Sequence, residues 1–128
     1  MNSAVLDASA LLVLLNREPG AERLTARILN SAVVSAVNIA EVYGKLIQRG
    51  LDPAQAWFAA LSPVREIAPF ATDDARSAGA LVSTTQTLGL SLGDRACLAL
   101  GLALSAPVYT ADRSWKNLSL GIRIHVIR

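Results

Sequence analysis

Four acidic residues of this 128-residue chain stand next to apolar segments, where an isolated charge is costly. Asp7 directly follows a short apolar run, and Glu41 lies in an apolar segment with helical spacing. Asp94 precedes the most apolar stretch of the chain, and Asp112 comes three residues after Tyr109 in a strand-like run. The other six acids lie in polar or turn segments: Glu18, Glu22, Asp52, Glu66, Asp73 and Asp74.

Carboxylates gathered in a partly desolvated pocket repel one another, so protons or cations must neutralise them. Oxygen ligands without clustered histidine or cysteine favour Mg²⁺ or Mn²⁺ over Zn²⁺. A hard divalent ion activates water for attack on a phosphodiester and offsets charge on the leaving oxygen, so no protein nucleophile is needed. We therefore predict that Asp7, Glu41, Asp94 and Asp112 are the metal ligands and the catalytic residues of one site.

Polar residues beside these acids are candidates for positioning water or substrate. The hydroxyls of Ser9 and Thr110 are placed to orient water or phosphate, with a turn-forming role as the alternative. Asn38 lies three residues before the glutamate and shares its helical face. Arg95 and Arg113 each follow an acid and are placed to hold flanking phosphates, with a structural ion pair as an equal alternative.

Each acid taken alone also has an ordinary structural interpretation. An aspartate at position 7, 94 or 112 suits a helix N-cap or a strand-end turn. Glu41 suits the surface of an amphipathic helix. These alternatives stay open residue by residue, and the shared site is favoured because all four acids adjoin apolar elements.

Strands alternating with helices predict an α/β fold with a mostly parallel sheet covered on both faces. Runs rich in valine and isoleucine predict strands at residues 4–6, 33–35, 64–67, 107–109 and 122–127. Helical spacing and caps predict helices at about 8–16, 20–30, 37–49, 53–61, 72–84 and 93–104. In such a sheet the strands before Asp7 and Asp112 are expected side by side, which brings both acids to the edge where ligands bind.

Composition points to one domain, residues 1–128, with 52% hydrophobic and only 17% charged residues, so much of the chain must be covered. The net charge of +2 does not decide between partners. A lone cysteine, Cys97, predicts a buried thiol and fits a reducing cytoplasm. The apolar stretch 96–106 is too short to cross a bilayer, so no membrane partner is expected. His125 is expected to be structural, and Trp57 and Phe58 are either core or dimer contacts.

Four segments, in order and across almost the whole chain, resemble the PIN-domain family and, within it, the VapC-type toxins of toxin–antitoxin pairs. The opening segment VLDASAL (5–11) resembles the family's first motif, and NIAEV (38–42) its second. LSLGDRAC (90–97) is similar to the third and most recognisable motif, and VYTADRS (108–114) to the fourth.

The resemblance implies a three-layer α/β/α sandwich and Mg²⁺- or Mn²⁺-dependent endonucleolytic cleavage of RNA. It also implies a homodimer and a cognate antitoxin that blocks the site, with Asp112 as the most variable ligand. One alternative is a catalytically inactive PIN-like module that binds RNA or protein, which leaves the four acids unexplained. Another is a phosphohydrolase with Asp7 as nucleophile, but Ala8 and Ser9 follow where a second acid is required.

Overall fold

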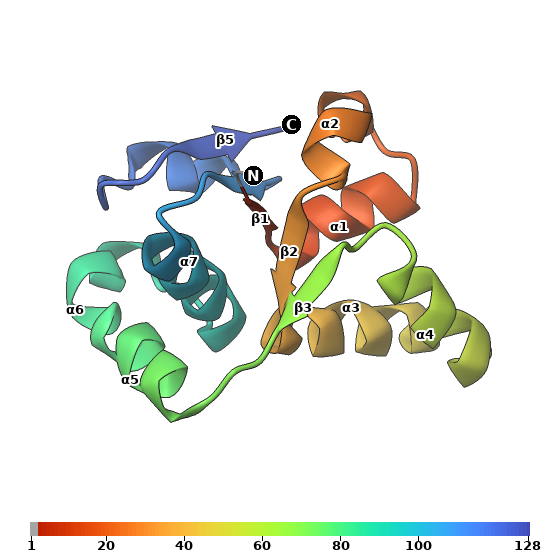
Figure 1. Cartoon of the computed structure of the whole chain (residues 1–128), viewed down its shortest axis with the longest axis horizontal. Helices are drawn as coiled ribbons and strands as arrows, with labels where there is room; N and C mark the ends of the chain where they lie inside the picture. Colours follow the sequence, from red (N-terminus) through yellow and green to blue (C-terminus); the bar gives the residue numbers. More distant parts are fainter. Residues whose placement is uncertain (1–2) are drawn as a thin grey trace.

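Five short parallel strands form the central sheet of the computed structural model, which describes residues 3–128 (Figure 1). The sheet order is β3-β2-β1-β4-β5, and every neighbouring pair is parallel. The strands are β1 (Ala4–Leu6), β2 (Ala32–Ser35), β3 (Glu66–Ala68), β4 (Val108–Thr110) and β5 (Ile124–Val126). The predicted α/β fold with a parallel sheet is confirmed.

Helices connect the strands, as parallel pairing requires. The α-helices are α1 (Ala8–Leu15), α2 (Ala26–Leu29), α3 (Ala36–Gln48), α4 (Pro53–Leu61), α5 (Thr72–Ala80), α6 (Val82–Thr85) and α7 (Leu92–Leu104). Three 3₁₀ turns complete the set: η1 (Ala21–Arg23), η2 (Gln86–Leu88) and η3 (Arg113–Asn117).

The helices cover both faces of the sheet and so make three layers. Figure 1 shows α5, α6 and α7 on one side, with α1, α3 and α4 on the other. Successive residues of a strand point to opposite faces, and accordingly Val5 packs with the α7 layer while Leu6 packs with the α1 and α3 layer. Both residues are fully buried, which explains why β1 is apolar throughout instead of alternating.

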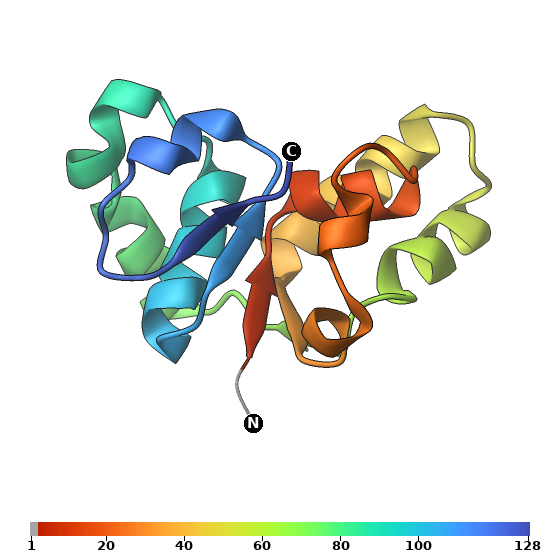
Figure 2. The same cartoon turned by 90° about the horizontal axis from the view of Figure 1, so that it is seen from above.

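β1 lies where the sheet reverses its direction of growth. From β1 the chain adds β2 and β3 on one side, and it then returns to add β4 and β5 on the other. Adjacent crossovers leaving a sheet in opposite directions open a crevice at the carboxyl ends of the strands. The register pairs Leu6 with Tyr109, so Asp7 and Thr110 reach that crevice together. Figure 2 shows β1, β4 and β5 running the same way toward it.

Two predicted helices are interrupted in the structure. The segment 20–30 forms η1 and then α2, because the backbone of Leu24 is not helical (φ −88°, ψ 80°). The Thr25 side chain then caps the new helix by accepting a hydrogen bond from Ile28 N at 3.4 Å. The segment 72–84 divides at Leu81 into α5 and α6. A single long helix at either place was therefore a wrong prediction.

Smaller differences concern strand ends and two aromatic residues. β3 begins at Glu66, two residues later than predicted. Trp57 and Phe58 are 45% and 76% exposed, which excludes the core as their location, although Trp57 packs edge to face on Tyr43 at 5.2 Å. The remaining helices lie where the sequence predicts them, within one or two residues.

Between residues 3 and 128, no helix by itself has both the length and the apolar character needed to cross a bilayer. The segments Thr72–Leu88 and Leu92–Leu104 reach that length and composition together, but a bend of 116° separates them.

Candidate metal centre

Of the four predicted ligands, Asp7 has the side chain that accepts hydrogen bonds from the most partners. It ends β1 and caps α1, where Oδ1 accepts a hydrogen bond from Ala10 N at 2.8 Å. Its side chain is only 3% exposed. Asp7 is therefore an N-cap, as one of the two interpretations of the sequence predicted. This capping bond holds the carboxylate at the carboxyl end of β1.

Two hydroxyl groups complete the bonding of Asp7. Thr110 Oγ1 donates to Oδ2 at 2.6 Å, and Ser9 Oγ lies 2.8 and 2.9 Å from the two carboxylate oxygens. Each hydroxyl in turn accepts a backbone N–H, from Asp112 at Thr110 and from Ala111 at Ser9. Ser9 and Thr110 therefore position Asp7 directly, whereas the sequence predicted contacts with water or phosphate.

Burial outweighs these hydrogen bonds in setting the acidity of Asp7. Desolvation raises its pKa from 3.8 to about 6, against the bonds from Thr110, Ala10 and Ser9, which lower it. The nearby charge of Asp94 raises the pKa further. An ionised Asp7 is thus held at an energetic cost that a cation would relieve.

Glu41 lies on α3 and reaches over the first turn of α7. Asn38 Nδ2 donates to Glu41 Oε1 at 2.9 Å and to the carbonyl oxygen of Gly93 at 3.0 Å, so one amide joins the two helices. A Cβ at Gly93 would overlap the Glu41 carboxylate, so any larger residue there would displace that side chain. Asn38 is 1% exposed, and its Oδ1 is a buried acceptor without a donor among the described residues.

Asp94 occupies the first turn of α7 as half of a capping box. Its Oδ2 accepts Ser91 N at 3.0 Å, while Ser91 Oγ accepts Asp94 N at 3.1 Å. Ser91 and Gly93 were not predicted as site residues, although a serine three residues before an acid is a capping signal that the sequence contains. The close approach at Gly93 involves a side chain from another helix, so no neighbouring residues in the sequence could predict it.

Cys97, one turn further along α7, lies among three of the acids. It is fully buried, as predicted. Burial raises the pKa of its thiol well above the usual value, and the charges of Asp7, Asp94 and Glu41 raise it further. Asp7, Asp94 and Glu41 are thus each near enough to this one thiol to act on it electrostatically.

Asp112 is connected to Asp7 through its backbone N–H and Thr110, and its carboxylate bonds elsewhere. Asp112 N donates to Thr110 Oγ1 at 3.0 Å, one bond away from Asp7. Its own Oδ1 accepts Ser114 N at 2.9 Å and Ser114 Oγ at 2.7 Å, which caps η3. The expected neighbourhood of Asp7 and Asp112 follows from the pairing of β1 with β4.

The two arginines next to the acids form no ion pair with them. Arg95 Nη1 donates to the Ala78 carbonyl oxygen at 3.0 Å, and its buried Nε has no partner among the described residues. Arg113 Nε donates to the Arg128 carbonyl oxygen at 3.3 Å. The ion-pair alternative is therefore wrong for both.

The carboxylate oxygens of the four acids are the kind of ligand that a hard divalent ion prefers. In this structure, however, they do not converge on one point. Within residues 3–128, no three His, Cys, Asp or Glu side chains are close enough to hold a metal ion. In the same part of the chain the one salt bridge joins Arg128 to Glu18 at 3.1 Å, so no basic side chain neutralises the four acids. Oxygen donors whose negative charge has no basic partner fit Mg²⁺ or Mn²⁺. To bind one ion together, the carboxylates would have to rotate and give up some of the hydrogen bonds that they accept here.

These features define a class: a parallel α/β protein with acidic residues at the carboxyl ends of its central strands and at the first turn of α7. The chain belongs to the PIN-domain family, whose sequence profile matches residues 4–120. No curated protein matches it in sequence.

Solved structures of similar fold include several toxin–antitoxin proteins. Mycobacterium tuberculosis VapC20, described as a sarcin–ricin loop cleaving toxin, is 21% identical with a TM-score of 0.75, over 94% of this chain and 99% of that one. The DNA-bound VapBC of Salmonella typhimurium is 16% identical with a TM-score of 0.73, over 97% of each chain. A Klebsiella pneumoniae toxin–antitoxin complex is 21% identical with a TM-score of 0.71, over 95% and 100%. At these identities the likeness establishes the fold.

Proposed function

We propose that the protein is a Mg²⁺- or Mn²⁺-dependent endoribonuclease and the toxin of a type II toxin–antitoxin pair. The observation that carries this proposal is the uncompensated charge of the crevice. Asp7 is buried with a raised pKa, Asp94 acts on it electrostatically, and Asp7, Asp94 and Glu41 have no basic partner among the described residues. The similar toxins of solved structure support the biological part of the proposal.

In this proposal Asp7, Glu41, Asp94 and Asp112 hold the ion. When bound, the ion supplies activation of water and neutralisation of charge on the phosphodiester. Ser9 and Thr110 keep the Asp7 carboxylate at the end of β1 through their hydroxyl hydrogens. Asn38 holds Glu41 against α7 and leaves Oδ1 as a buried acceptor for water.

The test compares charge-removing variants in an RNA cleavage assay with added Mg²⁺ or Mn²⁺. We expect Asp7→Asn and Asp94→Asn each to lose most activity while keeping the fold, because each weakens metal binding with little change in size. Asp73→Asn is the matched control, since Asp73 is exposed on α5 and has no side-chain contact with the crevice acids. EDTA should stop cleavage by the parent protein.

Two results would reject the nuclease. Normal cleavage by both crevice variants would remove the site assignment, and cleavage that resists EDTA would remove the metal. Absence of cleavage together with tight RNA binding would favour the inactive PIN-like module instead.

Exposed apolar side chains on α3, α4 and the loop between them support a protein partner. Ile47, Leu51, Trp57 and Phe58 are all more than a third exposed. We assign this surface to the cognate antitoxin and leave the homodimer contact as a separate prediction. Expression of the protein alone should arrest growth, and co-expression of a small protein encoded beside it should relieve the arrest. Harmless expression of an active enzyme would contradict toxicity and leave the nuclease chemistry intact.

A further inference from the structure

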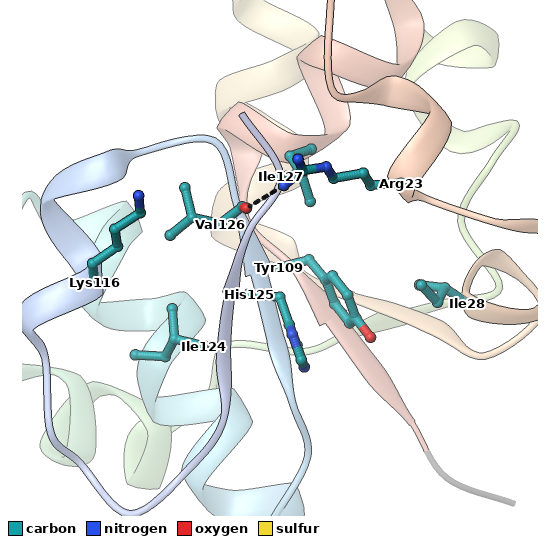
Figure 3. Close-up of a pocket in the computed structure, with 8 residues that line it drawn as sticks. All are labelled: Arg23, Ile28, Tyr109, Lys116, Ile124, His125, Val126 and Ile127. Atoms are coloured by element: carbon teal, nitrogen blue, oxygen red, sulfur yellow. Dashed lines mark hydrogen bonds between the residues drawn. The ribbon is translucent and has the colours of Figure 1, made fainter.

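A second feature lies at the β5 edge of the sheet and takes no part in the metal centre. It is a pocket of about 530 Å³, within the range of ligand-binding pockets. Its lining includes Arg23, Ile28, Tyr109, Lys116, Ile124 and His125 (Figure 3). No Asp or Glu of the described residues lines it, in contrast to the acidic crevice nearby.

Two rings from neighbouring strands stack at this pocket. Tyr109 of β4 and His125 of β5 lie with ring centroids 4.7 Å apart and planes inclined by 19°. Tyr109 is half-buried and His125 is exposed, at the last strand of the sheet. The outer face of the imidazole can therefore extend the stack with one more flat group. Stacking of nucleobases on aromatic rings is a common way of binding single-stranded nucleic acid.

Two cations line the pocket, Arg23 on the same side of the β5 ribbon as the stacked rings and Lys116 on the other side (Figure 3). The Arg23 guanidinium makes a single 3.4 Å hydrogen bond, from Nη1 to the Val126 carbonyl oxygen, which leaves most of its donors unused. Within residues 3–128 the Lys116 side chain makes no hydrogen bond or ion pair, and Figure 3 shows it across the β5 ribbon from Tyr109. The segment 113–128 carries four of the twelve Lys and Arg residues and none of the ten acids, so its surface attracts phosphate.

The pocket and the metal centre share strand β4. Asp7 N donates to the Tyr109 carbonyl oxygen at 3.1 Å, and Thr110, the next residue, donates to the Asp7 carboxylate. Asp7 and the pocket residue Tyr109 are therefore joined directly through the backbone.

We propose that this pocket binds a nucleotide of single-stranded RNA, with its base stacked on His125 and its flanking phosphates at Arg23 and Lys116. The inference rests on the proposed ribonuclease function and specifies its substrate as unpaired, because a base inside a duplex cannot present its face to a side-chain ring. It assigns His125 to substrate binding, whereas the sequence predicted a structural residue.

The test measures binding of a fluorescent single-stranded oligoadenylate in EDTA, with Asp7→Asn as the background so that nothing is cleaved. We expect His125→Ala to weaken binding about 5- to 160-fold, the range for loss of one base stack. His125→Phe keeps a ring and should restore most of the affinity. Inorganic polyphosphate, which has charge and no base, should bind His125→Ala as well as it binds the background protein.

Charge is tested separately through salt dependence. Affinity falls as salt rises, and Arg23→Gln and Lys116→Gln should each make this dependence less steep. The slope of log affinity against log salt should decrease in magnitude by about 0.7, the value for one phosphate contact on a single strand. Arg76→Gln removes an exposed cation on α5 that does not line the pocket, and it should leave the slope unchanged.

Three results would overturn the proposal: unchanged oligoadenylate affinity in His125→Ala, an equal loss for polyphosphate, or an Arg76→Gln effect as large as that of Arg23→Gln. Sedimentation of each variant is the last check. A change of mass in His125→Ala would make the ring a subunit contact and would also overturn the proposal. Because binding is read without cleavage, these outcomes are independent of whether the nuclease assignment succeeds.

Discussion

Asp7→Asn should make the metal-free protein more stable at neutral pH while it removes activity. Burial raises the pKa of Asp7 from 3.8 to about 6 in the folded protein. Between these two values the unfolded carboxyl is ionised and the folded one still carries its proton, so stability falls as pH rises through this window. Above it the folded protein bears a constant penalty of about 3 kcal/mol, from roughly two pKa units at 1.36 kcal/mol each.

The asparagine variant carries no such penalty because its side chain does not ionise. Its amide can replace the carboxylate at small cost, since the hydroxyls of Ser9 and Thr110 can rotate to accept hydrogen bonds as well as donate them. We therefore expect the stability difference between Asp7→Asn and the parent protein to shift by about 2 to 3 kcal/mol in favour of the variant between pH 4 and pH 8.

The assay is urea unfolding of both proteins in EDTA at a series of pH values, with Asp73→Asn as the control. The control removes an exposed acid outside the site, so its difference from the parent should lack the shift expected for Asp7→Asn. Adding Mg²⁺ at pH 8 should stabilise the parent and not Asp7→Asn, because only a ligand that binds the folded state shifts unfolding. A parent–variant difference that is the same at pH 4 and pH 8 would refute the reasoning.

Three other predictions concern neighbouring features. Gly93→Ala should displace the Glu41 carboxylate and reduce cleavage about 10- to 100-fold, whereas Gly44→Ala on the helix of Glu41 meets no atom within 4 Å and should leave the cleavage rate unchanged. Cys97 is fully buried with a raised pKa, so native protein should resist iodoacetamide and react only after unfolding, as mass spectrometry would show. Phe58→Ser removes a side chain that is 76% exposed, so chemical denaturation should find a stability change within about 0.5 kcal/mol.

The sequence predicted that the strands before Asp7 and Asp112 are neighbours, because this placement follows from the order of the strands. Asp7 and Asp112 come at the ends of strands, and the pairing of those strands in a doubly wound sheet was expected from general topology. Burial of Cys97 followed in the same way from an apolar helix between two layers. In each case one strong regularity, strand order or apolar content, determines the result.

Details set by contacts between distant segments were not readable. The hydroxyl of Thr110 serves Asp7 because two strands align in one register, and no local pattern records that register. The break between η1 and α2 at Leu24 depends on a threonine cap competing with continuation of the helix. The close approach at Gly93 depends on where a side chain from α3 happens to lie.

The hydrogen bond from Thr110 to Asp7 spans 103 residues of chain. A ribosome that adds about 5–20 residues per second needs roughly 5 to 20 s to make that length. Throughout this interval the emerging polypeptide holds the first carboxylate but lacks the strand that fixes it. If these acids take part in cutting RNA, the order of synthesis itself delays that activity until β4 has been made.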